Sequence, residues 1–207
     1  MWRAVLIYAC GVLLTVLGVA IPQPLTMPDH FPENVVHYIV IHHAASGAPD
    51  SEDAPRANKS NDGRATIKTP LGLSVDIDVH TIDRMHKARG FDEIGYNYVV
   101  RFDGTVERGR AEDIRGAHAR AWDSRGISYN ASSIGICFAG NCDAARWTEQ
   151  QQLSGYKLIL EMMRRYDVPP ERVIGHRECG MNTHCPGELV DMQKVREKLR
   201  LQKDEMP

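Results

Sequence analysis

Histidine and cysteine are the residue types of this sequence best suited to hold a metal ion. The chain has 207 residues, with nine histidines and five cysteines. Proteins hold zinc with neutral imidazole and thiolate groups in a tetrahedral set, and a catalytic zinc keeps one position open. Candidate ligands occur at three places: His42-His43, His176, and Cys185 in a Cys-Pro-Gly turn. None of the three is specific alone, because a lone histidine is more often a structural residue than a ligand.

Short apolar segments must position these histidines. The run 35–41 is β-branched and apolar on both faces, which predicts a strand buried between two layers. His42 follows at its C-terminal end, where side chains commonly enter a cleft, and a second apolar run at 173–174 precedes His176. Because side chains alternate along a strand, His42 and His43 are expected to face opposite sides of it.

The other segments predict an α/β fold, a mixed central β-sheet flanked by helices in a single domain. Thr148 and Gln151 form a capping box, so a helix is expected to begin there and to end near Tyr166. Asp103-Gly104 is a strong hairpin signal. The further elements expected are helices over 79–89 and 188–201, hairpin strands over 96–101 and 105–108, a strand over 134–139, and a long loop over 46–78.

The helix after Thr148 also carries a periodic apolar pattern. Its apolar residues recur at helical spacing and are expected to face the core; they are Leu153, Tyr156, Leu160 and Met163. The helix over 188–201 is expected to turn Met192, Val195 and Leu199 inward.

Composition excludes several classes of protein. Apolar residues make up 43% of the chain and charged residues 25%, which favours a globular domain over a disordered chain. The formal net charge is -2 and the sequence holds no basic run, so nucleic acid is not an expected partner. Five cysteines are few for a disulfide scaffold of this length. We expect a monomer.

The N-terminus departs from this composition. Residues 4–21 are uncharged and follow Arg3, and as a helix of about 1.5 Å per residue they are just long enough to cross a bilayer. Residues 1–21 are therefore expected to be a signal peptide or a membrane anchor, and the sequence leaves both open. A Pro-rich linker over 22–34, the folded domain over 35–201 and a polar tail over 202–207 are expected to follow.

An ordered series of motifs covers nearly all of this domain. The series resembles the zinc-dependent N-acetylmuramoyl-L-alanine amidases, a family that includes phage-type lytic amidases and peptidoglycan-recognition proteins. The motifs are IVIHHAA at 39–45, GFDEIGYNYVVRFDGTVERGR at 90–110, GAHA at 116–119, YNASSIGICFAGN at 129–141, and GHRE followed by THCPG within 175–187. The mixed sheet with flanking helices of that family agrees with the elements predicted above.

The resemblance implies a role for each matching residue. His42, His176 and Cys185 are the implied ligands of Zn²⁺. His43, on the opposite face of the strand from His42, is then expected to serve packing or to support a ligand. Tyr96 matches a tyrosine beside the metal, and Thr183 falls where relatives carry lysine or threonine, so both are implied to be catalytic. The positions that match groove-lining residues, and are implied to bind substrate, are His118 and Asn130. His118 and His184 are further candidates for protonating the leaving amine.

The implied reaction is zinc-dependent hydrolysis of the amide bond between N-acetylmuramic acid and L-alanine in peptidoglycan. An exported, periplasmic enzyme is expected, anchored in the inner membrane through residues 4–21 or released after signal cleavage. A phage lysis protein and a bacterial wall-remodelling enzyme are both compatible with this sequence.

Two other hypotheses stay open at this point. The first is a peptidoglycan-recognition module that cuts nothing; the complete set of three ligands favours the enzyme. The second is a disulfide-stabilised exported domain, in which Cys137, Cys142, Cys179 and Cys185 pair, or in which pairing spares Cys185. Pairing of Cys185 would remove a zinc ligand.

Overall fold

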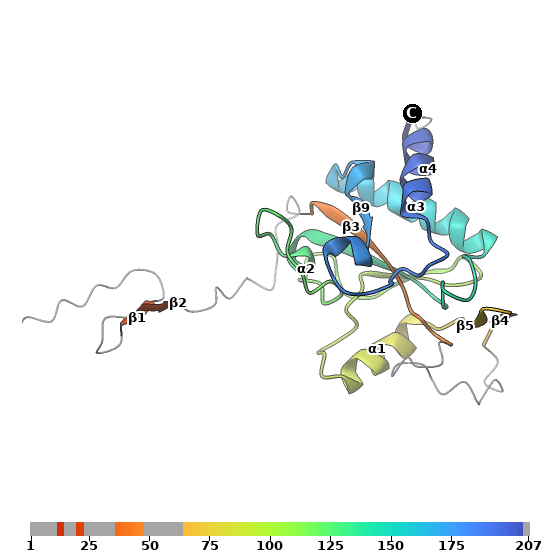
Figure 1. Cartoon of the computed structure of the whole chain (residues 1–207), viewed down its shortest axis with the longest axis horizontal. Helices are drawn as coiled ribbons and strands as arrows, with labels where there is room; N and C mark the ends of the chain where they lie inside the picture. Colours follow the sequence, from red (N-terminus) through yellow and green to blue (C-terminus); the bar gives the residue numbers. More distant parts are fainter. Residues whose placement is uncertain (1–11, 15–19, 23–35, 48–63, 205–207) are drawn as a thin grey trace, which may run out of the picture.

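The computed structural model describes residues 12–14, 20–22, 36–47 and 64–204 (Figure 1). Its centre is a five-stranded sheet in the order β7-β6-β8-β3-β9. The strands are β3 (Tyr38–His43), β6 (Tyr98–Val100), β7 (Val106–Arg108), β8 (Ser133–Phe138) and β9 (Val173–Gly175). All neighbours pair in parallel except β6 and β7, which form the predicted antiparallel hairpin. The predicted mixed α/β fold is therefore confirmed.

β3 lies between β8 and β9 in the sheet, although both are far from it along the chain. It pairs with β8 from Tyr38 to His43 and with β9 from Ile39 to Ile41. Its apolar residues on both faces are buried, as predicted for a strand between two layers. The strand ends at His43 instead of the expected Ile41, because pairing with β8 continues through His43 and Phe138.

Helices cover both faces of the sheet (Figure 1). On one face, α3 (Glu149–Tyr166) and α4 (Met192–Asp204) pack on side chains such as Ile39, Ile41 and Ile136. On the other face, Ile82 of α1 (Val79–Ala88) packs with Val99 and Cys137. The short helix α2 (Tyr129–Ser132) precedes β8, and two 3₁₀ turns, η2 (Pro170–Arg172) and η3 (His176–Cys179), flank β9.

The long helix α3 begins and ends as predicted. The side chain of Thr148 accepts from the backbone N–H of Gln151, and the Gln151 side chain accepts from the backbone of Thr148, which completes the capping box. The expected core position of Leu153 is wrong, because its side chain is 66% exposed. Helical periodicity located the buried stripe but not its width, and Leu153 lies at the stripe's solvent edge.

The last helix differs from the prediction at both ends. It begins at Met192 instead of Glu188, because residues 187–190 form a turn and Asp191 accepts from the backbone N–H groups of Gln193 and Lys194. Met192, Val195 and Leu199 are buried as expected. The helix continues to Asp204, into the segment expected to be a tail.

The expected loop over 46–78 contains a hairpin in its described part. Strands β4 (Thr66–Thr69) and β5 (Gly72–Val75) pair antiparallel. They are short, and β4 alternates exposed with half-buried residues, so the sequence offered little apolar signal. Residues 48–63 lie outside the described part of the chain.

The predicted N-terminal membrane segment lies mostly outside the described residues, as do residues 23–34 of the expected linker. Within 4–21 the described pieces belong to two short paired strands, β1 (Val12–Leu14) and β2 (Ala20–Pro22). This differs from the helical span that the sequence predicted. Across the described residues, we find no helix with the length and apolar character needed to cross a bilayer.

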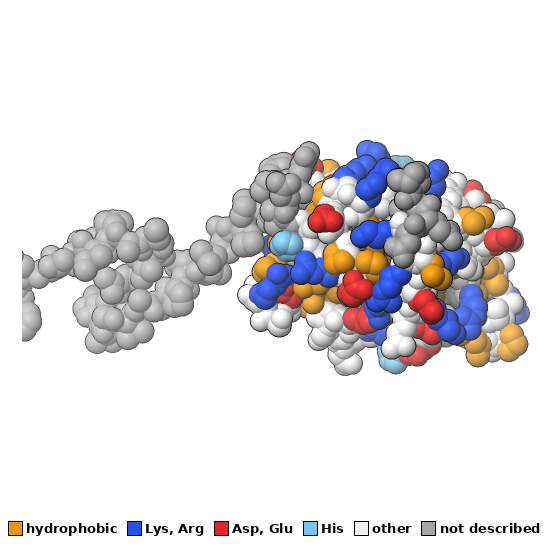
Figure 2. Space-filling model, turned by 90° about the horizontal axis from the view of Figure 1, so that it is seen from above, with side chains coloured by type: hydrophobic (Ala, Val, Ile, Leu, Met, Phe, Trp, Pro, Cys, Tyr) orange, Lys and Arg blue, Asp and Glu red, His pale blue; other side chains and the backbone are white. Residues whose placement is uncertain are grey.

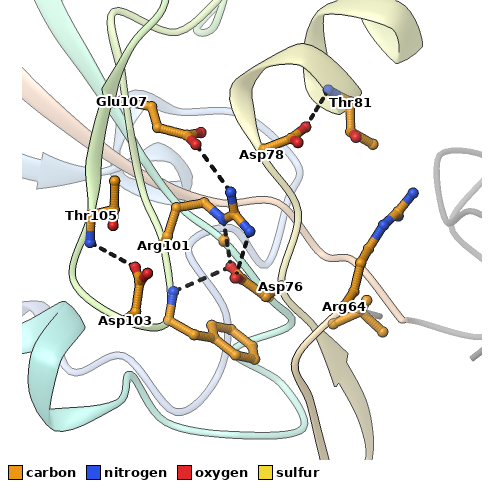
Figure 3. Close-up of polar contacts among 12 residues, drawn as sticks. Arg64, Asp76, Asp78, Thr81, Arg101, Asp103, Thr105 and Glu107 are labelled. Atoms are coloured by element: carbon orange, nitrogen blue, oxygen red, sulfur yellow. Dashed lines mark hydrogen bonds and ion pairs between the residues drawn. The ribbon is translucent and has the colours of Figure 1, made fainter. Parts of the chain in front are cut away.

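A network of charged side chains joins the β6–β7 hairpin to α1 (Figure 3). The Arg101 guanidinium donates two hydrogen bonds to Asp76, at 2.9 and 2.8 Å, and one to Glu107 at 3.0 Å. The second oxygen of Glu107 accepts from the backbone N–H of Val79, the first residue of α1. Asp78 caps the same helix by accepting from the N–H of Thr81. The network fixes the start of α1 against the sheet.

On the face drawn in Figure 2, basic and acidic side chains are interspersed, in keeping with the near-neutral charge of the chain.

The four cysteines that were candidates for disulfide pairing are free thiols. They are Cys137, Cys142, Cys179 and Cys185. The hypothesis that these four pair in disulfides is therefore contradicted, and Cys185 is left available as a ligand; Cys10 lies outside the described residues.

Candidate metal centre

The sheet brings two of the predicted ligands to one edge. β3 and β9 run parallel with Ile41 opposite Gly175, so His42, still within β3, and His176, just after β9, each follow that pair by one residue at the same end of the sheet. Their ring centroids lie 4.5 Å apart. With Cys185 they form a group whose potential ligand atoms all lie within 4.8 Å of one another. The structure thus assembles all three ligands that the sequence predicted.

The third ligand sits on a loop that one arginine fastens. Arg177, next to His176, donates from its guanidinium to the carbonyl oxygens of His184, Gly187 and Val190, at 3.1, 2.9 and 2.6 Å. Its backbone N–H also donates to the carbonyl oxygen of Cys185 at 2.8 Å. These four hydrogen bonds tie the loop to the end of β9, so the thiol of Cys185 is held beside the two histidines.

The chemistry of this donor set fits zinc. Nε2 of His176 is buried and has no hydrogen-bond partner in the described part of the chain, as expected of a nitrogen reserved for a metal. Burial lowers the pKa of His42 and of His176, which keeps both rings neutral. Burial raises the pKa of the Cys185 thiol to about 12. A bound cation would compensate a thiolate there. Two imidazoles and one thiolate are a ligand set that zinc prefers.

Tyr96 lies beside these ligands, as the resemblance implied. Its ring is half-buried, with its centroid 4.9 Å from that of His42 and 6.4 Å from that of His118. The ring of His86, from α1, also packs against Tyr96, with the centroids 5.3 Å apart, and its Nδ1 accepts from the backbone N–H of Gly95 at 2.9 Å. α1 thereby fixes the backbone just before Tyr96.

His118 and Asn130 lie near the ligands but are engaged with the protein. Nδ1 of His118 lies 3.0 Å from Nε2 of His42. Oδ1 of Asn130 accepts from the backbone N–H groups of His118 and Ala119, at 2.8 and 2.7 Å. A substrate-binding role for these two residues stays a prediction.

The two candidates next to Cys185 differ in their placement. The Thr183 hydroxyl accepts from the backbone N–H of Cys185 at 3.2 Å, so it supports the ligand loop from within. The side chain of His184 is 79% exposed and pairs with Glu188, which raises its pKa. His184 therefore points into solvent and not at the ligand group.

His43 has the structural role expected of a side chain on the opposite face of the strand. Its Nδ1 accepts from the backbone N–H of Cys142 at 3.0 Å.

Two residues that shape the centre, Arg177 and His86, were not identified from the sequence. Arg177 lies within the GHRE motif, and His86 lies just before the motif that begins at residue 90. Both act through hydrogen bonds to backbone groups, and such bonds leave no periodic signal in the sequence.

Comparisons with known proteins agree with this geometry. The family described as N-acetylmuramoyl-L-alanine amidase matches residues 32–188. Peptidoglycan-recognition protein SC2 of Drosophila melanogaster is 30% identical over 158 residues, which cover 76% of this chain and 71% of that protein. An endolysin of Enterobacteria phage K11 is 31% identical over 126 residues, 58% of this chain and 76% of the phage protein.

One solved structure resembles the fold of this chain over most of its length. The N-acetylmuramoyl-L-alanine amidase LysC from Clostridium intestinale URNW superposes with a TM-score of 0.60 at 25% sequence identity, over 87% of this chain and 95% of that one. The match of the family over most of the chain, with the same sheet and helices, leads to one conclusion: the chain belongs to the N-acetylmuramoyl-L-alanine amidase family.

Proposed function

We propose that this amidase hydrolyses the amide bond between N-acetylmuramic acid and L-alanine in peptidoglycan with the help of a zinc ion held by His42, His176 and Cys185. The observation that carries the proposal is the convergence of these three side chains, whose ligand atoms lie within 4.8 Å of one another. A zinc ion in such a set supplies a nucleophile at neutral pH and polarises the scissile carbonyl.

Tyr96 is the residue best placed to assist the chemistry. Its ring packs against His42, and its half-buried position leaves part of the side chain open to a ligand. When the amide carbon becomes tetrahedral, its oxygen gains negative charge, and a fixed phenol O–H can donate a hydrogen bond to it. Tyr96 therefore stabilises the developing oxyanion.

Thr183 contributes differently from a lysine at the same place. A threonine hydroxyl carries no charge, and this one accepts from the backbone N–H of Cys185. It keeps its own O–H free to donate, so it can order a water that delivers a proton to the leaving amine. The hydrogen bond that Thr183 accepts from Cys185 also helps to hold the Cys185 loop in place.

The second candidate function is recognition without cleavage, favoured by the similarity to peptidoglycan-recognition protein SC2. The complete ligand set argues for the enzyme. Digestion of purified peptidoglycan distinguishes the two: the amidase releases new L-alanine amino termini and no new reducing sugars. Binding without any product would support recognition alone, and new reducing ends would indicate a glycosidase, which needs a pair of acting carboxylates.

For the N-terminus we propose that residues 4–21 direct the chain to the inner membrane, so that the amidase domain faces the periplasm. The support is the uncharged stretch led by Arg3 and the location of the substrate outside the membrane. Fractionation of cells that express the full chain, protease treatment of spheroplasts and N-terminal sequencing test this. A domain found in the cytosol with residues 1–21 intact would contradict it.

A further inference from the structure

The two ring nitrogens of His42 have different neighbours. Nδ1 lies 3.6 Å from Sγ of Cys185, on the side of the ligand group. Nε2 lies 3.0 Å from Nδ1 of His118, a histidine that is outside the ligand group and only 8% exposed. His42 is itself fully buried, so neither nitrogen is exposed to bulk water.

This contact fixes where the protons must be. A neutral imidazole has one N–H donor and one acceptor nitrogen. If Nδ1 of His42 offers its lone pair to a metal, the proton is on Nε2, which then donates to Nδ1 of His118. His118 must accept there and carry its own proton on Nε2. The opposite arrangement would place a proton on the His42 nitrogen that faces Cys185.

We propose that His118 is a positioning residue, which accepts a hydrogen bond from Nε2–H of His42 and thereby presents Nδ1 of His42 to the zinc ion. This rests on the proposed function, because it assigns a task in building the same metal site. Ligand histidines usually donate their second N–H to a carboxylate, a carbonyl group or water, and here a second histidine takes that place.

The surroundings of His118 are built to hold its ring. Asn130 fixes the backbone by accepting from two successive N–H groups, those of His118 and Ala119. Two glycines make room for the ring itself: a Cβ at Gly135 would lie 2.6 Å from its Cδ2, and one at Gly116 would lie 2.8 Å from the same atom. Any larger residue at these two positions would push the ring away from His42.

The far nitrogen of His118 is compatible with the required proton. Nε2 is buried, and no described residue forms a hydrogen bond with it. No donor therefore opposes a proton on that atom.

Two substitutions separate the hydrogen bond from the volume of the side chain. His118→Asn keeps an acceptor, because its Oδ1 takes the place of Nδ1, whereas His118→Leu fills the space without an acceptor. Zinc affinity of the full chain in detergent is measured by competition with a chromophoric chelator. We expect His118→Leu to weaken zinc binding by about 10- to 100-fold, the usual cost of losing an outer partner of a ligand. His118→Asn should retain most of the affinity.

Nitrogen-15 NMR of the histidine rings in the zinc-loaded wild type tests the same proposal without any substitution. We expect metal at Nδ1 and a proton at Nε2 of His42, with a proton at Nε2 of His118. Metal at Nε2 of His42, or equal zinc affinity in wild type and His118→Leu, would overturn the proposal. A wild-type chain that binds no zinc would instead contradict the metal site itself, so the two failures are distinguishable.

Discussion

Nδ1 of His42 lies 3.6 Å from Sγ of Cys185, although 143 positions separate the two residues in the sequence. His42 lies near the end of β3, and Cys185 lies on a loop that Arg177 holds in place. The proposed ligand pair therefore depends on the sheet and on one short loop, and each can be tested separately.

Replacing Cys185 by serine should abolish stoichiometric zinc binding and amidase activity together, because a hydroxyl is a poor substitute for a thiolate ligand. Cys179→Ala is the matched control: this thiol is also buried and free, but it lies outside the ligand group. Metal analysis and release of L-alanine amino termini are the measurements. Full zinc content in Cys185→Ser would remove Cys185 from the ligand set.

Tyr96→Phe should lower turnover by about 10²- to 10³-fold, the typical effect of losing one oxyanion donor, while zinc content stays at the wild-type level. Tyr38→Phe serves as the control, since the Tyr38 hydroxyl donates to Asp123 at 3.0 Å, away from the ligands. Both variants are compared by steady-state rates per bound zinc. Wild-type turnover in Tyr96→Phe would exclude the hydroxyl from the reaction.

Arg177→Lys should weaken zinc binding even though position 177 offers no metal ligand. A lysine carries its donors on a single nitrogen and cannot span the three carbonyl groups of His184, Gly187 and Val190, which Arg177 reaches with two separate guanidinium nitrogens. The Cys185 loop should then become mobile, with faster loss of zinc to a chelator. Arg146→Lys is the comparison, because Arg146 makes a single bond of this type, to Leu189. Equal zinc loss in both variants would contradict this role of Arg177.

The metal-free protein should lose stability as the pH falls from about 6.5 toward 5. Burial lowers the pKa of His43 and of His86 to about 4, against a value of 6.5 for a free side chain. The unfolded chain therefore takes up protons that the folded chain does not, so the free energy of unfolding decreases with falling pH. His184, whose pKa is raised, opposes this only weakly because it is exposed.

Urea unfolding of the chelator-treated chain at pH 7.5, 6.5 and 5.5 measures this trend. Above about pH 7 the curve should level off, since the histidines are then neutral in both states. An increase in the free energy of unfolding when the pH is lowered from 6.5 to 5.5 would contradict the neutral, buried state of His43 and His86.

The two histidine positions were predictable because each follows an apolar run typical of a strand, and parallel strands end at one edge of a sheet; the choice of His42 over His43, and Cys185 as third ligand, came from the family resemblance. His42 and His176 meet for that reason. The contact between His42 and His118 was not predictable in this way. It depends on how the segment around residues 116–119 is held by Asn130, and such side-chain bonds to backbone groups follow no period.

Errors in the predicted fold have similar causes. Leu153 shares the period of the buried helix face, but only the packing partners decide how wide that face is. The β4–β5 hairpin is short and largely solvent-facing, so it lacks the apolar run by which strands are recognised. α3, with its strong cap, was predicted nearly to the residue, and the β6–β7 hairpin was predicted at the right turn, although β6 is shorter than the expected strand over 96–101.

The position of β3 between β8 and β9 also has a consequence for the order of events during synthesis. β3 is the first of the five strands of this sheet to leave the ribosome, but its two partners, β8 and β9, are separated from it by most of the domain. Until Val173–Gly175 has been made, one side of β3 has no neighbour, and parallel pairing across so much chain is intrinsically slow. The proposed metal centre therefore stays incomplete until His176 and Cys185 have been synthesised, and a partly synthesised chain cannot hydrolyse peptidoglycan.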